Sequence, residues 1–308
     1  MVPRSSERGA GRSDNSAYRR YRMIALHEEA QVTERPAAHR QSIALCPRQI
    51  EKPWGRVDLP EPFANDSGDK VGEIWFEHPS GDDLPLLVKY IFTTEKLSVQ
   101  VHPDDKQAQA RGLDRGKTEC WYILDAEPDS MLGIGLTEPL SPDDIREAAL
   151  DGSIEQLLDW KPVRAGDFVF VPAGTIHAIG SGISLLEFQQ NADVTYRLYD
   201  YGRPRELHLD DATAVSKPDF DDCANFSRRG TEDGVLVSTP HFSLLRATDV
   251  QQIPTSLAER RTWIMPLQGT VTAGDVTVAA GGCMLAAPGA ALSFSPSAAV
   301  LIGTEGAI

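Results

Sequence analysis

The sequence has few cysteines and no long apolar segment. Its four cysteines, Cys46, Cys120, Cys223 and Cys283, stand far apart and form no C-x2-C pair. Scattered cysteines in a chain of 308 residues are typical of free thiols in a reducing cytoplasm, and they argue against a zinc ribbon or a disulfide scaffold. Because no run of about 18 apolar residues occurs, we expect no transmembrane helix and no membrane partner. These absences predict a cytoplasmic protein.

Basic residues are also scarce. Lys and Arg number 30 against 45 Asp and Glu, giving a net charge of −15, whereas nucleic-acid binding needs a basic footprint. We therefore expect no nucleic-acid partner. The first forty residues differ, with eight Arg and five acidic residues, no apolar periodicity and no secretory h-region. We expect residues 1–41 to be a disordered tail or sequence upstream of the true start, with a transit peptide as the alternative.

From residue 42 onward the pattern is that of a β protein. Pro and Gly recur between short apolar runs, which is typical of strands joined by turns. Short strands in this number favour a closed barrel or a jelly roll. The predicted strands cover residues 72–78, 85–93, 96–102, 119–126, 167–173, 177–190 and 195–201.

Residues 140–160, "LSPDDIREAALDGSIEQLLDW", form a helical insertion in this pattern. Ser141 is placed to cap a first helix, with Pro142 at its first position and Asp144 three residues after the cap. Ser153 and Gln156 match a second capping box. We expect two short helices.

A second β unit follows a polar stretch. Residues 203–235 are mixed and polar and predict a linker, after which strand-like alternation resumes. A Gly-x5-Pro spacing occurs in both units, at Gly166–Pro172 and at Gly282–Pro288, but the second copy lacks a histidine. The repeat is either real or a coincidence of two common residues. We expect a catalytic domain over 42–235 and a C-terminal β domain, a degenerate copy of the first, over 236–308.

The stretch "GDFVFVPAGTIHAIG" fits the pattern G-x5-P-x-G-x2-H, ending at His177. A strand, a tight Pro-Gly bend and a returning strand would aim this ring into a barrel. A structural histidine in a hairpin is the simpler reading of this motif alone. Further donors favour a metal site, since Gln100 and His102 share one face of a predicted strand and Glu119 opens the next. Such a donor set suits Zn²⁺, although Mn²⁺, Fe²⁺ or Co²⁺ would also fit.

Four segments resemble class I mannose-6-phosphate isomerases of the short bacterial form, which are cupins. They are "LPLLVKYIFTTEKLSVQVHPDD", "GKTECWYIL", "GDFVFVPAGTIHAIG" and "LLEFQQNADVTYRLYDYGRPRELH". The resemblance extends from the "KPWG" at 52–55 to the "RELH" at 205–208 and is weaker beyond residue 235. It implies a cupin jelly roll and one Zn²⁺ per chain, with Gln100, His102, Glu119 and His177 as ligands.

The resemblance also implies a set of catalytic and substrate-binding residues. Arg197, Lys117, Lys89 and Ser98 fall on the family's arginine, lysine and serine positions, and Glu187 and Asp193 match the acidic positions upstream of the arginine. We expect Arg197, Glu187 and Lys117 to be catalytic, and Ser98, Lys117, Lys89 and Asp193 to bind substrate. Larger family members have a histidine before the lysine, but this chain has Gly116 there, so a base at that position is not available. Glu187 is the candidate base, because a carboxylate in a half-dry cavity can have its pKa raised. A salt bridge from Glu187 to Arg197 or Lys117 is the competing interpretation.

The predicted function is isomerisation of D-mannose 6-phosphate and D-fructose 6-phosphate through a cis-enediol, supplying GDP-mannose synthesis or mannose use. The predicted partner is a small sugar phosphate, and the chain is expected to be a monomer or a homodimer. Two alternatives stay open at this point. One is another metal cupin enzyme such as a dioxygenase, and the other is a non-catalytic bicupin that binds a sugar phosphate.

Overall fold

The computed structural model describes residues 41–65, 67–217 and 227–308, and all of them belong to one compact unit. The predicted tail, residues 1–41, lies almost wholly outside the described residues, as do Cys223 and residues 219–222. The three described cysteines are free thiols, as expected. Among the described residues, no helix combines the length and the apolar character that crossing a membrane requires.

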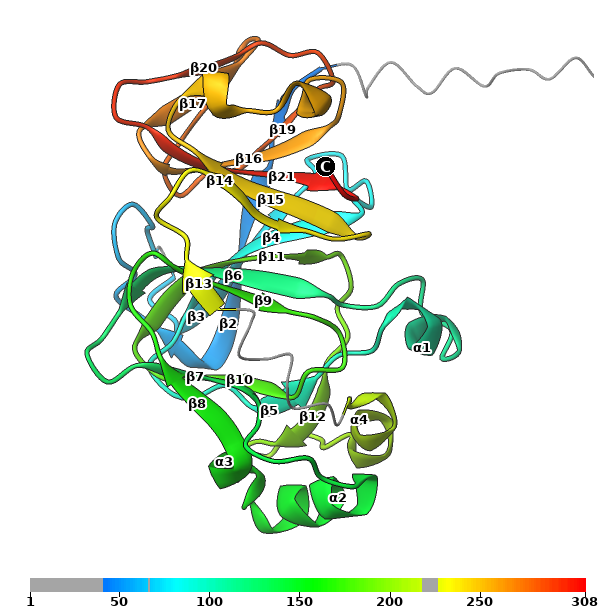
Figure 1. The fold of residues 1–308 in the computed structure, drawn as a ribbon. Helices are drawn as coiled ribbons and strands as arrows, with labels where there is room; N and C mark the ends of the chain where they lie inside the picture. Colours follow the sequence, from blue (N-terminus) through cyan, green and yellow to red (C-terminus); the bar gives the residue numbers. More distant parts are fainter. Residues whose placement is uncertain (1–40, 66, 218–226) are drawn as a thin grey trace, which may run out of the picture. The chain divides into compact units, whose positions relative to one another are not determined.

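Two antiparallel sheets, built from strands between residues 46 and 229, face one another (Figure 1). The seven-stranded sheet has the order β13-β9-β6-β11-β4-β3-β2, and the five-stranded sheet has the order β12-β5-β10-β7-β8. Their bounds are β2 Cys46–Arg56, β3 Val71–Glu77, β4 Leu86–Phe92, β5 Val99–Val101, β6 Glu119–Ala126, β7 Met131–Leu136, β8 Leu158–Pro162, β9 Asp167–Val171, β10 His177–Ile179, β11 Ile183–Gln190, β12 Tyr196–Tyr199 and β13 Ser227–Arg229.

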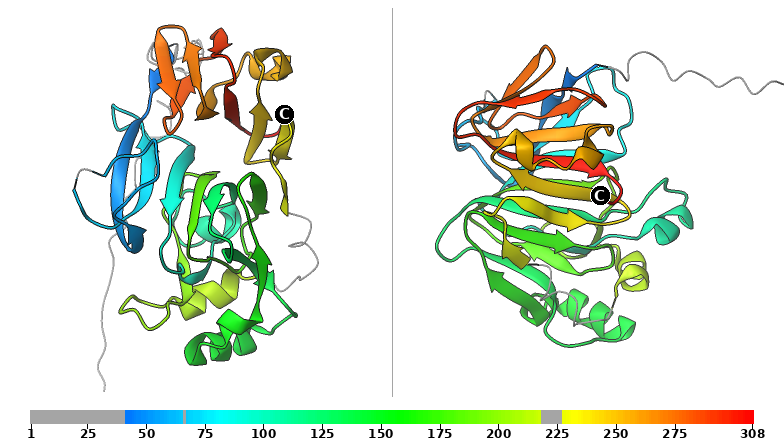
Figure 2. Two further views of the ribbon diagram at one scale, coloured as in Figure 1. Left: turned by 90° about the vertical axis from the view of Figure 1, so that its left-hand side faces the viewer. Right: turned by 45° about the horizontal axis from the view of Figure 1, so that its top comes forward.

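The remaining strands form a six-stranded sheet of order β1-β19-β16-β21-β15-β14 and a three-stranded sheet of order β18-β17-β20. Figure 2 shows these strands, yellow to red except for the blue β1, stacked on one side of the seven-stranded sheet in both views. Their bounds are β1 Ile43–Ala44, β14 Gly234–Ser238, β15 Phe242–Ala247, β16 Thr262–Gln268, β17 Thr270–Ala273, β18 Val276–Ala279, β19 Met284–Ala286, β20 Leu292–Phe294 and β21 Ala299–Glu305.

Helices are few and short. Helices α2 and α4 cover the outer face of the five-stranded sheet, where Val99 and Val101 pack against Ile145 and Ala212. The described helices are α1 Asp105–Gln109, α2 Pro142–Asp151, α3 Ile154–Leu157, α4 Leu209–Val215 and the 3-10 turns η3 Val250–Gln252 and η4 Thr255–Leu257. The predicted box at Ser141 and Asp144 is confirmed, but the one at Ser153 is wrong. The Ser153 hydroxyl makes no capping hydrogen bond, because the Ser153 backbone is helical, with φ −66° and ψ −17°, whereas a capping residue is usually extended.

Strand alternation divides the seven-stranded sheet into two differently used faces. On β4, Tyr90 and Phe92 point toward the C-terminal sheet, where they share an apolar core with Trp263. The intervening Ile91 belongs to the core between the two facing sheets, together with Trp121. Lys89 and Glu187 occupy the same inner face as Ile91, because Glu187 of β11 pairs directly with Lys89 of β4. The fold therefore directs charged groups into the space between the two facing sheets.

The segment that follows β12 differs from its prediction. Residues 203–235 are not simply a linker, because helix α4 lies within them and its Ala212 and Val215 are buried. The polar composition hid a helix that buries only one narrow face.

The boundary between two domains near residue 235 stays a prediction. In the structure, Phe188 of β11 packs so closely on the C-terminal sheet that a Cβ at Gly303 would lie 2.3 Å from its ring.

Candidate metal centre

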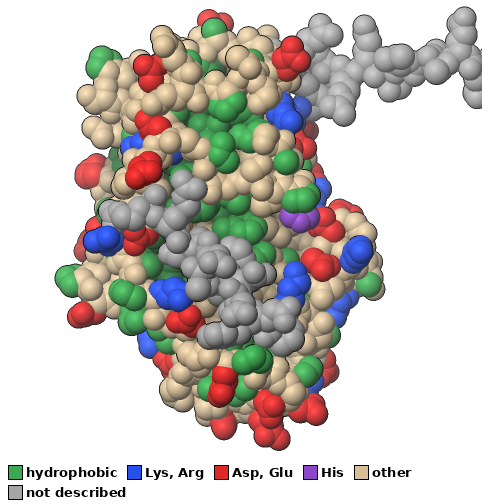
Figure 3. Space-filling model, in the orientation of Figure 1, with side chains coloured by type: hydrophobic (Ala, Val, Ile, Leu, Met, Phe, Trp, Pro, Cys, Tyr) green, Lys and Arg blue, Asp and Glu red, His purple; other side chains and the backbone are tan. Residues whose placement is uncertain are grey.

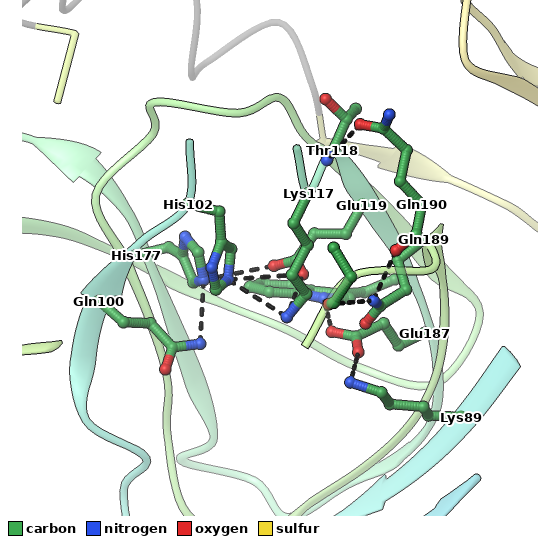
Figure 4. A network of polar contacts seen from close by, with 12 residues as sticks. Lys89, Gln100, His102, Lys117, Thr118, Glu119, His177, Glu187, Gln189 and Gln190 are labelled. Carbon is green, nitrogen blue, oxygen red and sulfur yellow. Dashed lines mark hydrogen bonds and ion pairs between the residues drawn. The ribbon is translucent and has the colours of Figure 1, made fainter. Parts of the chain in front are cut away.

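Three side chains from three strands converge at one end of the space between the sheets (Figure 4). They are His102, just after β5, Glu119 at the start of β6 and His177 at the start of β10, and all three are buried. His177 Nε2 lies 3.3 Å from Glu119 Oε1, and His102 Nε2 lies 3.6 Å from Glu119 Oε2. All the candidate ligand atoms lie within 4.8 Å of one another.

Both histidine rings are in the neutral form that a metal ligand requires. His177 Nδ1 donates to the Thr175 carbonyl at 2.9 Å, which places its lone pair on Nε2, the atom facing the cluster. Burial and the nearby Lys117 ammonium lower the pKa of His177 to about 4, although the Thr175 contact opposes this shift. Burial, Lys117 and His177 together hold the pKa of His102 well below its usual range. Both rings are therefore uncharged at neutral pH.

The buried Glu119 carboxylate has few partners to offset the loss of its hydration. Neither oxygen has a well-directed hydrogen-bond donor among the described residues, and Oε2 is paired by the Lys117 ammonium at 3.0 Å. Burial, opposed by Lys117, raises the pKa of Glu119 above its usual range. Two imidazole lone pairs that point at a carboxylate repel it unless a cation lies between them. These residues therefore fit a divalent ion.

Gln100 is the fourth predicted ligand and lies beside the cluster. Its backbone pairs with that of His177, and its Nε2 lies 3.2 Å from His177 Nε2. Its Oε1 accepts a hydrogen bond from the Ser98 hydroxyl at 3.2 Å. A half-turn of the amide would exchange the two atoms and offer the oxygen as a ligand. The polar side of residues 96–102 thus faces inward, and Ser98 and His102 are buried.

A second charged pair lies next to the metal centre. Glu187 Oε2 is 3.1 Å from Lys89 Nζ, and its Oε1 accepts a hydrogen bond from Trp121 Nε1 at 3.1 Å. Burial alone would raise the pKa of Glu187, but the Lys89 and Lys117 ammonium groups outweigh it and lower the pKa to about 2. The expectation of a raised pKa is therefore wrong, because the sequence did not show that Lys89 stands directly opposite Glu187.

Arg197 and Asp193 border a cavity next to the metal centre. Arg197 Nη1 donates to the Glu206 carbonyl at 2.7 Å rather than to Glu187 or Asp193. Arg205 follows on the same connection and holds both Asp200 oxygens at 2.6 Å. The predicted salt bridge from Glu187 thus goes to Lys89, and neither Arg197 nor Lys117 is its partner.

Most of the predicted site residues line one open cavity. Seven predicted site residues border it, namely Lys89, Ser98, Gln100, Lys117, Glu187, Asp193 and Arg197. The wall of the cavity also carries a group that was not predicted from the sequence: Lys52, Trp54, Glu73, Trp75 and Arg205. Glu73 accepts from Trp75 Nε1 at 2.5 Å and pairs with Lys52 Nζ at 3.3 Å. A carboxylate inside the predicted strand 72–78 was the available signal for this group.

Several known proteins are similar to the chain, although no protein-family model matches it. A mannose-6-phosphate isomerase of Streptococcus mutans is 37% identical over 248 residues, covering 67% of this chain and 78% of that protein. The mannose-6-phosphate isomerase ManA of Bacillus subtilis is 43% identical over 155 residues, covering 46% and 49%.

Solved structures agree with these relatives. A mannose 6-phosphate isomerase from Bacillus subtilis superposes with a TM-score of 0.67 at 25% identity, covering 85% of this chain and 99% of that one. A zinc-bound mannose 6-phosphate isomerase, at 12% identity and a TM-score of 0.64, shares the fold over 86% of this chain and all of its own length. The predicted cupin fold, mainly β with a few helices, is confirmed.

Proposed function

The chain belongs to the mannose-6-phosphate isomerase family, and from this premise we propose that it interconverts D-mannose 6-phosphate and D-fructose 6-phosphate with one bound Zn²⁺. The observation that carries the proposal is the juxtaposition of two sites. A buried two-histidine, one-carboxylate cluster adjoins a cavity that also holds a carboxylate and several fixed cations. An isomerase of sugar phosphates needs both parts.

His102, Glu119 and His177 would hold the ion, and Gln100 would add an amide oxygen. When bound, the metal supplies Lewis-acid polarisation of the sugar oxygens. Lys117 contributes from the protein side, because its ammonium lies 3.0 Å from Glu119 Oε2 and 3.3 Å from His102 Nε2. That position favours the ionised form of the ligand carboxylate, against the effect of burial, and presents a positive charge to the cavity, where negative charge develops on an enediolate.

Glu187 is the proposed base that moves the proton between C1 and C2. It borders the cavity, it is ionised at neutral pH, and Trp121 and Lys89 fix its two oxygens. A low pKa weakens a carboxylate as a base in the free enzyme. Lys89 is therefore proposed to do more than bind substrate, since any movement of its ammonium toward the sugar phosphate would leave Glu187 more basic.

The remaining cavity residues are proposed to bind the rest of the substrate. Arg197 and Arg205 offer two guanidinium groups at the wall of the cavity that also carries Ser98, and guanidinium matches phosphate oxygens. Ser98 and Asp193 are proposed to contact sugar hydroxyls. In an acidic chain, this concentration of cations at one cavity is what recognition of a dianion requires.

The setting of the reaction is also a proposal. We propose that the enzyme works in the cytoplasm, as a monomer or a homodimer, and supplies precursors of GDP-mannose. The three free thiols among the described residues are compatible with a reducing compartment. Figure 3 shows acidic and basic side chains interspersed among the described residues of one face, with no continuous basic patch there for a nucleic acid.

The test is a coupled assay of the full chain with mannose 6-phosphate, after chelation and after zinc is restored. We expect turnover that disappears with chelator and returns with stoichiometric Zn²⁺. Glucose 6-phosphate as the alternative substrate measures selectivity. A zinc-loaded protein that binds the sugar phosphate without turning it over would refute the isomerase assignment, and oxygen consumption by an iron-loaded sample would favour a dioxygenase.

A further inference from the structure

Asp105 is the last residue of the motif "QVHPDD", and none of the proposed catalytic roles involves it. It is the first residue of α1, three positions after the candidate ligand His102. Its Oδ1 accepts two hydrogen bonds, one from the Gly116 backbone N–H at 2.8 Å and one from Gln190 Nε2 at 2.9 Å. One carboxylate oxygen thus joins the segment after His102 to two other parts of the site.

Gln190 extends this connection to the next residues. Its Oε1 accepts the Thr118 backbone N–H at 2.9 Å, while its own backbone N–H donates to the Thr118 carbonyl at 3.0 Å. The Lys117 backbone N–H between them donates to the Pro103 carbonyl at 3.0 Å. Three consecutive N–H groups, at residues 116, 117 and 118, are therefore held by residues 103–105 and by Gln190.

This segment carries Lys117 and leads directly into Glu119. Strand β6 begins only at Glu119, so the preceding residues take their placement from these side-chain and turn contacts rather than from a β ladder. The approach is very close, because a Cβ at Gly116 would lie 2.5 Å from the Pro103 carbonyl oxygen. A displacement of about 1 Å at a catalytic centre can cost two orders of magnitude in rate.

A side chain of the C-terminal strands reaches the same carboxylate. His241 Nδ1, next to the start of β15, lies 3.5 Å from Asp105 Oδ2. The turn that carries His241 is itself fixed, since its backbone N–H donates to the Thr239 hydroxyl and its carbonyl accepts the Gly306 N–H. The Gly116, Gln190 and His241 contacts outweigh burial and lower the pKa of Asp105, which favours its charged form.

We propose that Asp105 is a positioning residue for the metal centre. It locks residues 116–118 against the segment that follows His102, and so sets where Lys117 and Glu119 stand relative to the two histidines. His241, beside the C-terminal strands, holds the Asp105 carboxylate in place, which gives that part of the chain a role in the active site. The part of the inference that concerns turnover rests on the proposed function, whereas the part that concerns metal affinity does not.

The test compares Asp105→Ala, Asp105→Asn and Asp104→Ala in the full chain. Asp104 is the matched control, because its side chain caps α1 by accepting the Gln107 N–H and makes no hydrogen bond to residues 116–118. Zinc affinity is measured by competition with a chromophoric chelator, and kcat and KM are measured with mannose 6-phosphate. Visible absorption of the cobalt(II)-substituted protein reports the coordination geometry.

We expect Asp105→Ala to weaken zinc binding by about 10-fold or more, as loss of supporting contacts around metal ligands typically does. It should lower kcat by a similar factor, change KM by less than about 3-fold and alter the cobalt spectrum. Asp105→Asn keeps an oxygen acceptor for Gly116 and Gln190, so it should stay within about 3-fold of the wild type. Asp104→Ala should lower thermal stability alone.

Other outcomes would overturn the proposal. Unchanged zinc affinity and kcat in Asp105→Ala, with a stability loss equal to that of Asp104→Ala, would make Asp105 a simple helix residue. If Asp105→Ala does not fold, Gln190→Met removes the second bridge and should also weaken zinc binding. His241→Ala should weaken it by roughly 2- to 5-fold, within the range for supporting contacts, and no change would exclude this role of His241. A wild type that binds zinc without turnover refutes the isomerase function but leaves the affinity test intact.

Discussion

Substitution of Gly116 by alanine should damage the site far more than its small size suggests. The added Cβ would lie 2.5 Å from both the Asp104 carbonyl carbon and the Pro103 carbonyl oxygen, and 2.7 Å from the Asp105 nitrogen. Carbon contacts are comfortable at about 3.5–4.0 Å, so the two backbone segments would have to separate by about 1 Å. None of the three atoms belongs to a side chain that can rotate away.

The expected magnitude follows from what this separation breaks. It stretches the bonds from the Lys117 N–H to Pro103 and from the Gly116 N–H to Asp105, each worth about 1 kcal/mol. Overpacking adds about 1–3 kcal/mol, so we expect a loss of about 3–5 kcal/mol in unfolding free energy. A shift of about 1 Å in Lys117 and Glu119 should lower kcat by about 100-fold.

Gly112→Ala is the matched control. Gly112 lies in the same connection between α1 and β6, has a φ of +78°, and would have no atom within 4 Å of an added Cβ. Its substitution should cost about 1–2 kcal/mol through backbone strain alone and leave kcat unchanged. Urea denaturation measures the unfolding free energy of both variants, and steady-state kinetics measures their kcat. If Gly116→Ala kept wild-type kcat and zinc affinity, the steric reasoning would be refuted.

The other predictions concern the metal, the base, a buried ion pair and the capping of two helices. His177→Ala should lose bound zinc and activity together, and metal analysis that still finds one equivalent of zinc would contradict its role. Glu187→Gln should keep zinc but slow exchange of the C2 hydrogen with solvent by about 100-fold or more, whereas unchanged exchange would exclude it as the base. Lys89→Met should cost about 3–5 kcal/mol at pH 6 by leaving Glu187 unpaired. Because the pKa of Glu187 is lowered to about 2, the stability from this pair is complete above the ordinary Glu value of about 4.3 and is lost as the pH falls toward 2. The stability gap between Lys89→Met and wild type should therefore narrow in urea titrations at pH 3, and a constant gap would disprove the pairing. Ser141→Ala should cost about 1 kcal/mol and Ser153→Ala almost nothing, since only Ser141 caps its helix, and equal losses on thermal denaturation would contradict this.

The strands and the metal cluster could be predicted because their signals are local. Alternation from Ser98 to His102 specifies which side chains share a face, and the bend at Pro172 and Gly174 returns the chain so that His177 pairs with Gln100. Short elements were harder to predict. Helix α4 has only seven residues and shows no clear apolar period. Strands β7 and β8, which are joined through the helical insertion, show no clear apolar period either.

The electrostatic partners could not be predicted, because they depend on strand register. Glu187 pairs with Lys89 rather than with Lys117 or Arg197 only because β11 lies against β4 in one particular alignment. Lys52 reaches Glu73 across a strand pair whose register shifts between Ile50 and Glu51 and again before Arg56. Bulges of this kind redirect side chains in ways that a single sequence does not reveal.

The two-residue strand β1 has a consequence for the order in which the molecule is completed during synthesis. Ile43 and Ala44 pair with β19, and the Ala287 N–H donates to the Ser42 hydroxyl across 245 residues of sequence. The strand β2, which borders the cavity through Lys52 and Trp54, begins two residues after β1 ends. A ribosome therefore releases the segment that anchors one wall of the active site long before it releases that segment's partner. The chain should become a competent enzyme only after β19 has been synthesised, and until then β1 has no partner strand and is open to mispairing with other chains.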